Sequence, residues 1–213
     1  MALIKGKTSQ KIRTAHRYLG LFLGIQFLFW TISGLYFSWT ELDEIHGDHF
    51  KKVKVKNQFK NLLSPSELNF GAAINFLELK EIAGIPYYWI NGTKLINAYD
   101  GDVKDSITKQ EAIIISNNNI LDEYKISDIE IINEVGNHHE YRGRPLPAYV
   151  ISYEGSDKLK SYISIKDGQF QTVRHRSWRW FDFLWMTHTM DYESSCLLYT
   201  SPSTRDVEES RMP

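Results

Sequence analysis

Cysteine is almost missing from this chain of 213 residues. The only one, Cys196, lies in a C-terminal stretch that we interpret below as non-native, so neither disulfides nor thiolate metal sites are expected. Positive charge is not in excess either, since the formal net charge is −1. The sequence therefore offers no global electrostatic attraction for nucleic acid, which we exclude as a partner.

The signature motifs of several enzyme classes are also missing. The chain has no G-x-S-x-G and no H-E-x-x-H, so it does not resemble a hydrolase of either kind. It has no G-x-x-x-x-G-K-[ST] and no G-x-G-x-x-G, so it shows no nucleotide site of its own. Any redox role would therefore need an electron donor outside this chain.

Charged residues are missing from one long stretch, Tyr18–Trp39, which contains no Asp, Glu, Lys or Arg. As a helix it would be about 33 Å long, against roughly 30 Å for the hydrocarbon core of a bilayer. The apolar region of a cleaved signal peptide is shorter, about 7–15 residues, and ends at a small-x-small site. The stretch therefore predicts a transmembrane helix over residues 18–39 that stays attached as an anchor.

The two sides of this helix differ in charge. Residues 1–17 contain basic side chains and no acidic one, whereas acidic side chains follow the helix. The basic residues are Lys5, Lys7, Lys11, Arg13 and Arg17, and the acidic ones are Glu41, Asp43, Glu44 and Asp48. The positive-inside rule then predicts a cytoplasmic N-terminus over residues 1–17 and a main domain, residues 40–177, outside the cytoplasm.

One face of the predicted helix is formed mostly by small or polar residues, which fall within an arc of about 80° on a helical wheel. They are His16, Gly20, Gly24, Phe27, Thr31, Gly34 and Ser38. Gly20 and Gly24 have the spacing of a close helix–helix seam, which periodicity alone favours. The alternative is a groove for a flat cofactor, with the His16 imidazole at its mouth as a ligand of haem iron.

Residues 40–177 predict an α+β domain in two similar halves. The first half is expected to be a helix from Ser64 to about Lys80, followed by a hairpin that turns at Asn91-Gly92. The second is expected to be a helix from Thr108 to about Ser116, a strand over residues 126–134 and another hairpin.

The two predicted hairpins end alike, in Asp100-Gly101 and in Asp167-Gly168. We interpret both dipeptides as turns in which glycine supplies a positive φ, and we assign no catalysis to them. The expected unit is thus a helix packed on a hairpin, repeated once.

Two short segments contain side chains that can ligate a transition metal through nitrogen and oxygen. The first contains His46 and His49, and the second is His138-His139-Glu140. Short polar clusters of this kind are commonly solvated, and Gly47 weakens a helix that would bring His46 and His49 to one face. They are weak metal candidates.

A second aromatic stretch follows the domain. If it is helical, one face is formed by aromatic residues and a histidine, and arginines precede or flank it, as is typical of a membrane interface. The face consists of Trp178, Phe181, Trp185, His188 and Tyr192, and the arginines are Arg174, Arg176 and Arg179. It predicts the interfacial start of a second, truncated membrane helix over residues 178–194. The polar residues 195–213 have no helical or strand periodicity, and we expect a non-native tail there, with a native disordered tail as the alternative.

Two motifs carry a family resemblance. They are HRYLGLFLGIQFLFWTISGLYFSWTELDEIHGDH, which contains His16, and FDFLWMTHTMDYE, which contains His188. With the repeated hairpin that ends in Asp-Gly between them, the chain resembles the PepSY-associated transmembrane family, which includes iron-regulated inner-membrane proteins and ferric-siderophore reductases.

The resemblance implies a bacterial inner-membrane protein with a periplasmic PepSY-like domain that supports iron acquisition. Haem b held between membrane helices would pass electrons to a ferric siderophore, with His16 and His188 as candidate ligands. We expect these two histidines to lie about 33 Å apart, on opposite sides of the membrane, so each would need another axial partner.

Two other functions remain open. One is a non-enzymatic module, anchored in the membrane, that binds a periplasmic partner or restrains a peptidase. The other is a structural subunit that associates with itself or with a separate membrane subunit through Gly20 and Gly24.

Overall fold

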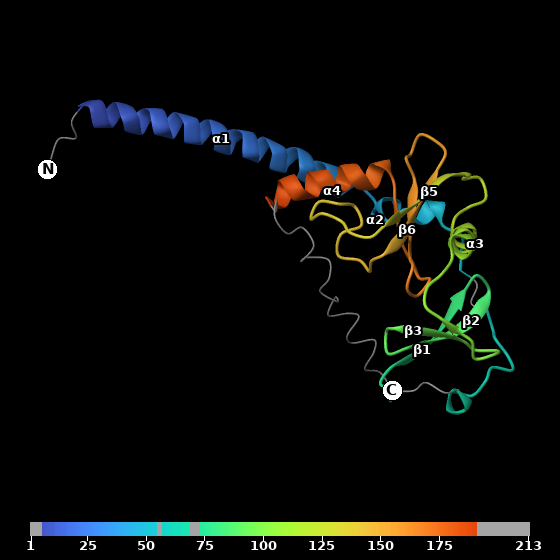
Figure 1. The fold of residues 1–213 in the computed structure, drawn as a ribbon. Helices are drawn as coiled ribbons and strands as arrows, with labels where there is room; N and C mark the ends of the chain where they lie inside the picture. The colour runs from blue at the N-terminus through green and yellow to red at the C-terminus, as the bar shows by residue number, and fades with distance from the viewer. Residues whose placement is uncertain (1–5, 55–56, 69–72, 191–213) are drawn as a thin grey trace, which may run out of the picture.

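The computed structural model describes residues 6–54, 57–68 and 73–190. A long N-terminal helix projects from an α+β body, and a shorter C-terminal helix returns along it (Figure 1). The α+β class with one long apolar N-terminal helix is therefore confirmed. The tail expected over residues 195–213 and the end of the segment expected over 178–194 lie outside the described residues.

The N-terminal helix, α1 (Gly6–Trp39), has 34 residues and is about 51 Å long. Most of its large apolar side chains are not covered by the rest of the molecule, and Phe22 and Trp39 are 63% and 77% exposed. Among the described residues, α1 is the one helix long and apolar enough to cross a membrane. It begins well before Tyr18 because the basic segment in front of the apolar stretch is itself rich in helix-forming residues.

The first sheet is a four-stranded antiparallel meander in the order β1-β2-β3-β4. Its strands are β1 (Leu77–Ile82), β2 (Ile85–Ile90), β3 (Lys94–Asn97) and β4 (Val103–Lys104). Asn91 and Gly92 both have positive φ in the turn between β2 and β3, which confirms the predicted hairpin.

The helix predicted from Ser64 to about Lys80 is wrong. Among the described residues of this range, the helical part is one 3-10 turn, η2 (Pro65–Glu67), and its start is closed by a capping box between Ser64 and Glu67. The residues near Lys80 instead form β1, because their side chains alternate and the strand pairs with β2 along its whole length. The first half of the body is therefore a meander and not a helix on a hairpin.

The second sheet is also an antiparallel meander, in the order β5-β6-β7-β8. Its strands are β5 (Ile126–Ile132), β6 (Ala148–Tyr153), β7 (Lys160–Ser164) and β8 (Phe170–Arg174). Helix α3 (Lys109–Asn119) precedes it, starts at a capping box between Thr108 and Glu111, and contacts β6, β7 and β8. The helix, strand and hairpin predicted for this half are confirmed.

One hydrophobic core joins the two sheets and α3. It contains Ile82 and Leu95 from the first sheet, Ile115 from α3, and Ile151 and Ile163 from the second. At its edge the Lys80 ammonium lies 2.6 Å from the Asp167 carboxylate, so an ion pair also connects β1 to the turn after β7. Packing across the sheets, and not strand pairing, unites them in one body.

Three short elements connect α1 to this body. Helix α2 (Leu42–Ile45) and the 3-10 turn η1 (Asp48–Phe50) follow α1, and α4 (Arg176–Thr189) follows β8. The His175 ring, which is almost fully buried, hydrogen-bonds through Nε2 to the Ile45 carbonyl oxygen at 3.2 Å. The start of α4 is therefore fixed against the segment that leaves α1.

Candidate functional site

Helix α4 packs antiparallel on the C-terminal half of α1 (Figure 1). Phe37 contacts the rings of Phe181 and Trp185, with centroids 5.0 and 5.6 Å apart. Further along α1, the Trp30 indole N–H donates to the His188 carbonyl oxygen at 2.7 Å. Aromatic packing and hydrogen bonds therefore place His188 beside the apolar part of α1, deeper than the outer approach expected from the sequence.

The His188 ring is oriented by Ser33. Ser33 Oγ donates its one proton to the Phe29 carbonyl oxygen at 2.7 Å, and it lies 2.7 Å from His188 Nδ1. With this proton on the Phe29 carbonyl, Ser33 Oγ accepts the Nδ1–H of His188, and we assign the ring to that tautomer. In that tautomer Nε2 has the lone pair and forms no hydrogen bond with the described residues.

The other residues of the predicted haem site lie elsewhere on α1. His16 is exposed, and the rise of the helix places it about 25 Å from the level of Ser33. A Cβ added to Gly20 or Gly24 would meet nothing within 4 Å. Helix α4 covers the face of Gln26, Trp30, Ser33 and Phe37, about 110° around the helix from the glycine face. The glycine face therefore stays open, and His16 and His188 are not brought together.

The histidines that were weak metal candidates do not converge. His46 lies at the C-terminal end of α2 and His49 in η1, with the positive φ of Gly47 between them. The His49 ring contacts Phe50 and His175 instead. In the part of the chain that the structure describes, no group of three or more His, Cys, Asp or Glu side chains is arranged to hold a metal ion.

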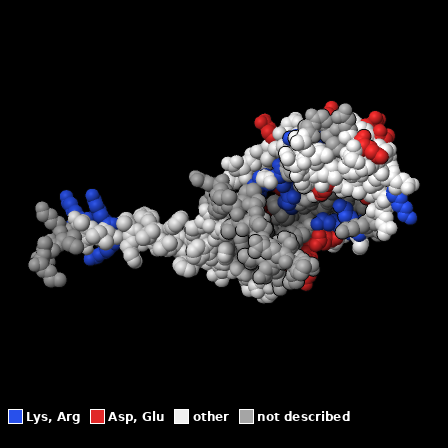
Figure 2. Space-filling view, turned by 90° about the horizontal axis from the view of Figure 1, so that it is seen from below, with Lys and Arg blue, Asp and Glu red and all other residues white. Residues whose placement is uncertain are grey.

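A cavity of about 800 Å³ lies where the segment after α1, the start of α4 and the second sheet meet. Its apolar wall comes from α2 and α4, and consists of Leu42, Ile45, Trp178, Phe181 and Trp185. Six cationic side chains line the rest, namely Lys51, Lys52, Lys54, Arg142, Arg144 and Arg174, against the three acidic residues Asp48, Glu140 and Asp182. One face of the molecule is visibly hollowed, with Lys, Arg and acidic side chains gathered there (Figure 2).

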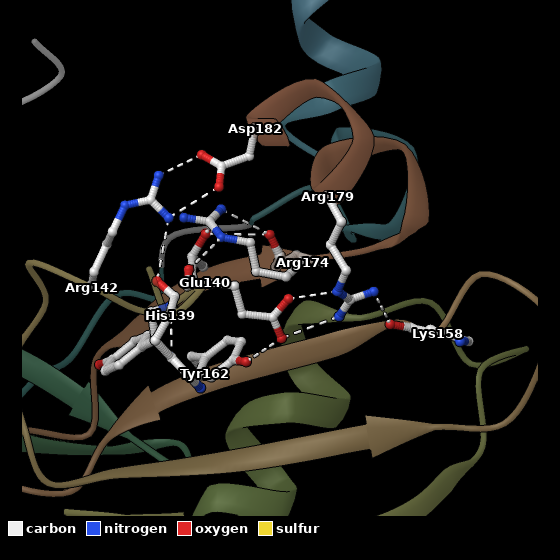
Figure 3. A network of polar contacts seen from close by, with 11 residues as sticks. His139, Glu140, Arg142, Lys158, Tyr162, Arg174, Arg179 and Asp182 are labelled. Carbon is white, nitrogen blue, oxygen red and sulfur yellow. Dashed lines mark hydrogen bonds and ion pairs between the residues drawn. The ribbon is translucent and has the colours of Figure 1, made fainter. Parts of the chain in front are cut away.

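Two ion pairs connect α4 to the loop between β5 and β6 (Figure 3). The Arg142 guanidinium donates to both carboxylate oxygens of Asp182, at 2.5 and 3.1 Å. The Arg179 guanidinium donates to both oxygens of Glu140, at 2.6 and 3.1 Å. Such bidentate pairs fix direction as well as distance, so the loop and the start of α4 form one rigid wall.

The charge of Glu140 is stabilised within this wall. Burial alone would raise the pKa of the Glu140 carboxyl, but hydrogen bonds from Arg179 and from the Tyr162 hydroxyl outweigh burial and lower that pKa below its ordinary value. Burial raises the pKa of the Tyr162 phenol, and the hydrogen bond to Glu140 adds to the effect. Glu140 therefore stays ionised and Tyr162 neutral at physiological pH.

Arg174 is a partly buried cation without a carboxylate partner of its own. Its guanidinium donates to the Glu140 carbonyl, the Val173 carbonyl and the Thr172 hydroxyl, and lies 3.9 Å from the centre of the Trp178 ring. Among the described residues it forms no ion pair, whereas Arg142 and Arg179 each form one. Burial, with the nearby charge of Arg144, lowers the pKa of Arg174 to about 10.

This basic cavity was not predicted from the sequence. Arg174 and Arg179 were interpreted as flanking residues of a membrane helix, and Glu140 as part of a weak metal cluster. The cavity assembles from segments far apart in the sequence, from α2 to α4, so no local spacing could reveal it. The one sequence signal was the clustering of arginines near Arg142 and Arg174.

Comparisons with known protein families, with curated proteins and with solved structures found no match to this chain.

Proposed function

We propose that this chain is a PepSY-like protein of the bacterial inner membrane, with a cytoplasmic N-terminus and a periplasmic main domain. It supports iron acquisition by haem-dependent transfer of single electrons to a ferric siderophore. The electrons come from an external donor of the membrane, since the sequence contains no nucleotide-binding motif.

The orientation of His188 is the observation that supports this proposal most. Ligating histidines generally donate their second ring N–H to an oxygen acceptor, which fixes the tautomer and the ring plane. Ser33 supplies that acceptor, and His188 Nε2 is left with its lone pair. His188 is therefore oriented as a side chain that would hold haem iron through Nε2.

When bound, haem supplies one-electron chemistry that no side chain of this protein provides. His188 would hold the iron through Nε2, while Ser33 keeps the ring oriented and Trp30 holds the backbone of α4. His16 would serve a second haem toward the cytoplasmic end of α1, because it is too far from His188 to share one iron. Any further protein ligand would have to come from another part of the chain or from a second protein.

We expect the His188→Ala variant to lose the b-type haem absorption of the membrane-expressed chain, measured as a dithionite-reduced minus oxidised spectrum. Ser33→Ala should retain haem but shift its midpoint potential or lower its occupancy, because the ring loses its orienting acceptor. Thr31→Ala is the matched control, since among the described residues the Thr31 hydroxyl bonds only to the Phe27 carbonyl of its own helix. Absence of haem from the unsubstituted chain would refute the proposal.

The open glycine face favours a second candidate function, a structural subunit that associates through α1. Gly20 and Gly24 permit close backbone approach, and α4 leaves their face uncovered.

For this candidate we expect Gly20→Ile combined with Gly24→Ile to abolish association in a membrane crosslinking assay while leaving insertion unchanged. Bulky side chains on this face would separate the two backbones. Leu21→Ile combined with Leu28→Ile, on exposed positions away from the glycine face, is the control. Crosslinking that survives the glycine substitutions would eliminate the subunit role.

A further inference from the structure

We infer that the basic cavity between α2, α4 and β8 binds the phosphate-bearing headgroup of an anionic membrane phospholipid. The inference concerns a site other than His188 and does not depend on haem. It requires only that α1 crosses a membrane, as its length and composition allow.

The position of the cavity is the first support. Its apolar wall is formed by α2, which begins shortly after α1 ends, and by the first turns of α4, which packs on α1. With Tyr18–Trp39 across a bilayer, Trp39 would mark the level where the bilayer meets water, and the cavity residues Leu42 and Ile45 follow it closely along the chain. Trp178 and Trp185 in the wall are residues that favour this level.

The charge of the cavity is the second support. Six cationic and three acidic side chains line it, which leaves a net charge of +3. The three acidic residues are already engaged, Asp48 by Lys51, Glu140 by Arg179 and Asp182 by Arg142. Lys52 is paired with Asp122, which does not line the cavity. Arg174 and Lys54 form no ion pair with the described residues, so an anion that enters meets their positive charge.

The third support is Arg174, a cationic side chain of the cavity wall that forms no ion pair with the described residues. Its guanidinium is partly buried, stacks on Trp178 and bonds only to neutral oxygens among the described residues. The nearby carboxylates of Glu140 and Asp182 act on Arg174 only through space, because each is hydrogen-bonded to another arginine. A phosphate diester would give Arg174 a direct anionic partner through planar, paired hydrogen bonds. Lys54, which is exposed at the rim and forms no ion pair with the described residues, would add a second contact.

An anionic amphiphile can contact both the cationic side chains and the apolar wall of the cavity, whereas a soluble anion can contact only the cationic side chains. The headgroup phosphate would bind Arg174 and Lys54, and the acyl chains would lie along Trp185 and the exposed apolar side chains of α1. The bound lipid would also fix the main domain at a set height above the bilayer.

The test uses the full chain in a neutral detergent, with bound lipid counted by native mass spectrometry. Phosphatidylglycerol and phosphatidylcholine of identical acyl chains are the probes, because they share the phosphate but differ in net charge. We expect the protein to retain phosphatidylglycerol in preference. Equal retention of the two lipids would overturn the inference.

The variants locate the site. We expect Arg174→Gln and Lys54→Gln each to weaken phosphatidylglycerol binding by about fivefold or more, the usual contribution of one cation near an anionic headgroup. Lys94→Gln, which removes an exposed lysine of β3 that does not line the cavity, should have no effect. Lys54 is exposed and without an ion pair among the described residues, so that variant stays informative if Arg174→Gln fails to fold. If Arg174→Gln and Lys54→Gln weaken phosphatidylglycerol binding no more than Lys94→Gln does, the assignment of the site is wrong.

A competition experiment distinguishes a lipid-binding site from a site for a soluble anion. Inorganic phosphate is added at millimolar concentration before the lipid. Unchanged preference for phosphatidylglycerol supports a lipid site, because the apolar wall contributes to binding. If phosphate abolishes the preference, the cavity binds a soluble anion and the lipid assignment is wrong.

Discussion

Gly168→Ala is expected to lower the free energy of unfolding by about 3 kcal/mol. Gly168 has a φ of +65°, where an alanine is strained by roughly 1 kcal/mol. An added Cβ would also lie 3.0 Å from Ile82 Cγ1 and 3.1 Å from Ile107 Cγ2. Both isoleucines are buried in the core that joins the sheets, so neither can move aside without cost.

Gly92→Ala provides the matched control for this prediction. Gly92 has a similar φ of +70°, but a Cβ there would meet nothing within 4 Å. We therefore expect Gly92→Ala to lower the free energy of unfolding by only about 1 kcal/mol, from backbone strain alone. Urea unfolding of the full chain in neutral detergent, followed by tryptophan fluorescence, measures both variants. Equal losses would show that Gly168 is not in tight contact across the sheets.

Glu140→Ala is expected to lower the free energy of unfolding by about 2 kcal/mol, because it leaves a partly buried cation unpaired. Arg179 loses its bidentate partner, and the Tyr162 hydroxyl loses its acceptor at 2.6 Å. The pair is not fully buried, since the side chains of Arg179 and Glu140 are 30% and 15% exposed, so the loss is smaller than for a pair deep in a core. Glu130→Ala, on the exposed side of β5, should change the unfolding free energy little.

The pH dependence provides a further check on Glu140. Its carboxyl has a folded-state pKa below the ordinary value, so its contribution to stability is present above the unfolded-state pKa of about 4.3. That contribution is lost as the pH falls through the lower folded-state pKa. We therefore expect Glu140→Gln to be less stable at neutral pH and to lose less stability than the unsubstituted chain on acidification. Parallel pH profiles would contradict the pairing with Arg179.

The sequence by itself determined the elements whose signals are local. The uncharged run Tyr18–Trp39 requires either burial or a membrane, and α1 is the result. Asn91-Gly92 and Asp167-Gly168 specify turns because they tolerate positive φ, and both turns formed. Thr108 with Glu111 specifies a helix start because the two side chains bond the backbone reciprocally within the first turn.

A local helix-start signal did not predict the structure correctly where the segment could pair with another strand. Ser64 and Glu67 form a capping box, yet the element it starts is a 3-10 turn, Pro65–Glu67, and the residues near Lys80 form a strand. A capping box fixes only the first turn, whereas β1 gains a full register of hydrogen bonds with β2. The pairing of β1 with β2 therefore outweighed the local preference of this segment for helix.

Only the tertiary structure decided which side chains share a site. It paired His188 with Ser33, far away along the chain, and left His16 and the glycine face of α1 without contact to α4. It also gathered arginines from the β5–β6 loop, β8 and α4 around one cavity and its wall beside the end of α1. The physical reason is that ion pairs and aromatic contacts act over a few ångströms in space, whatever the separation of the residues along the chain.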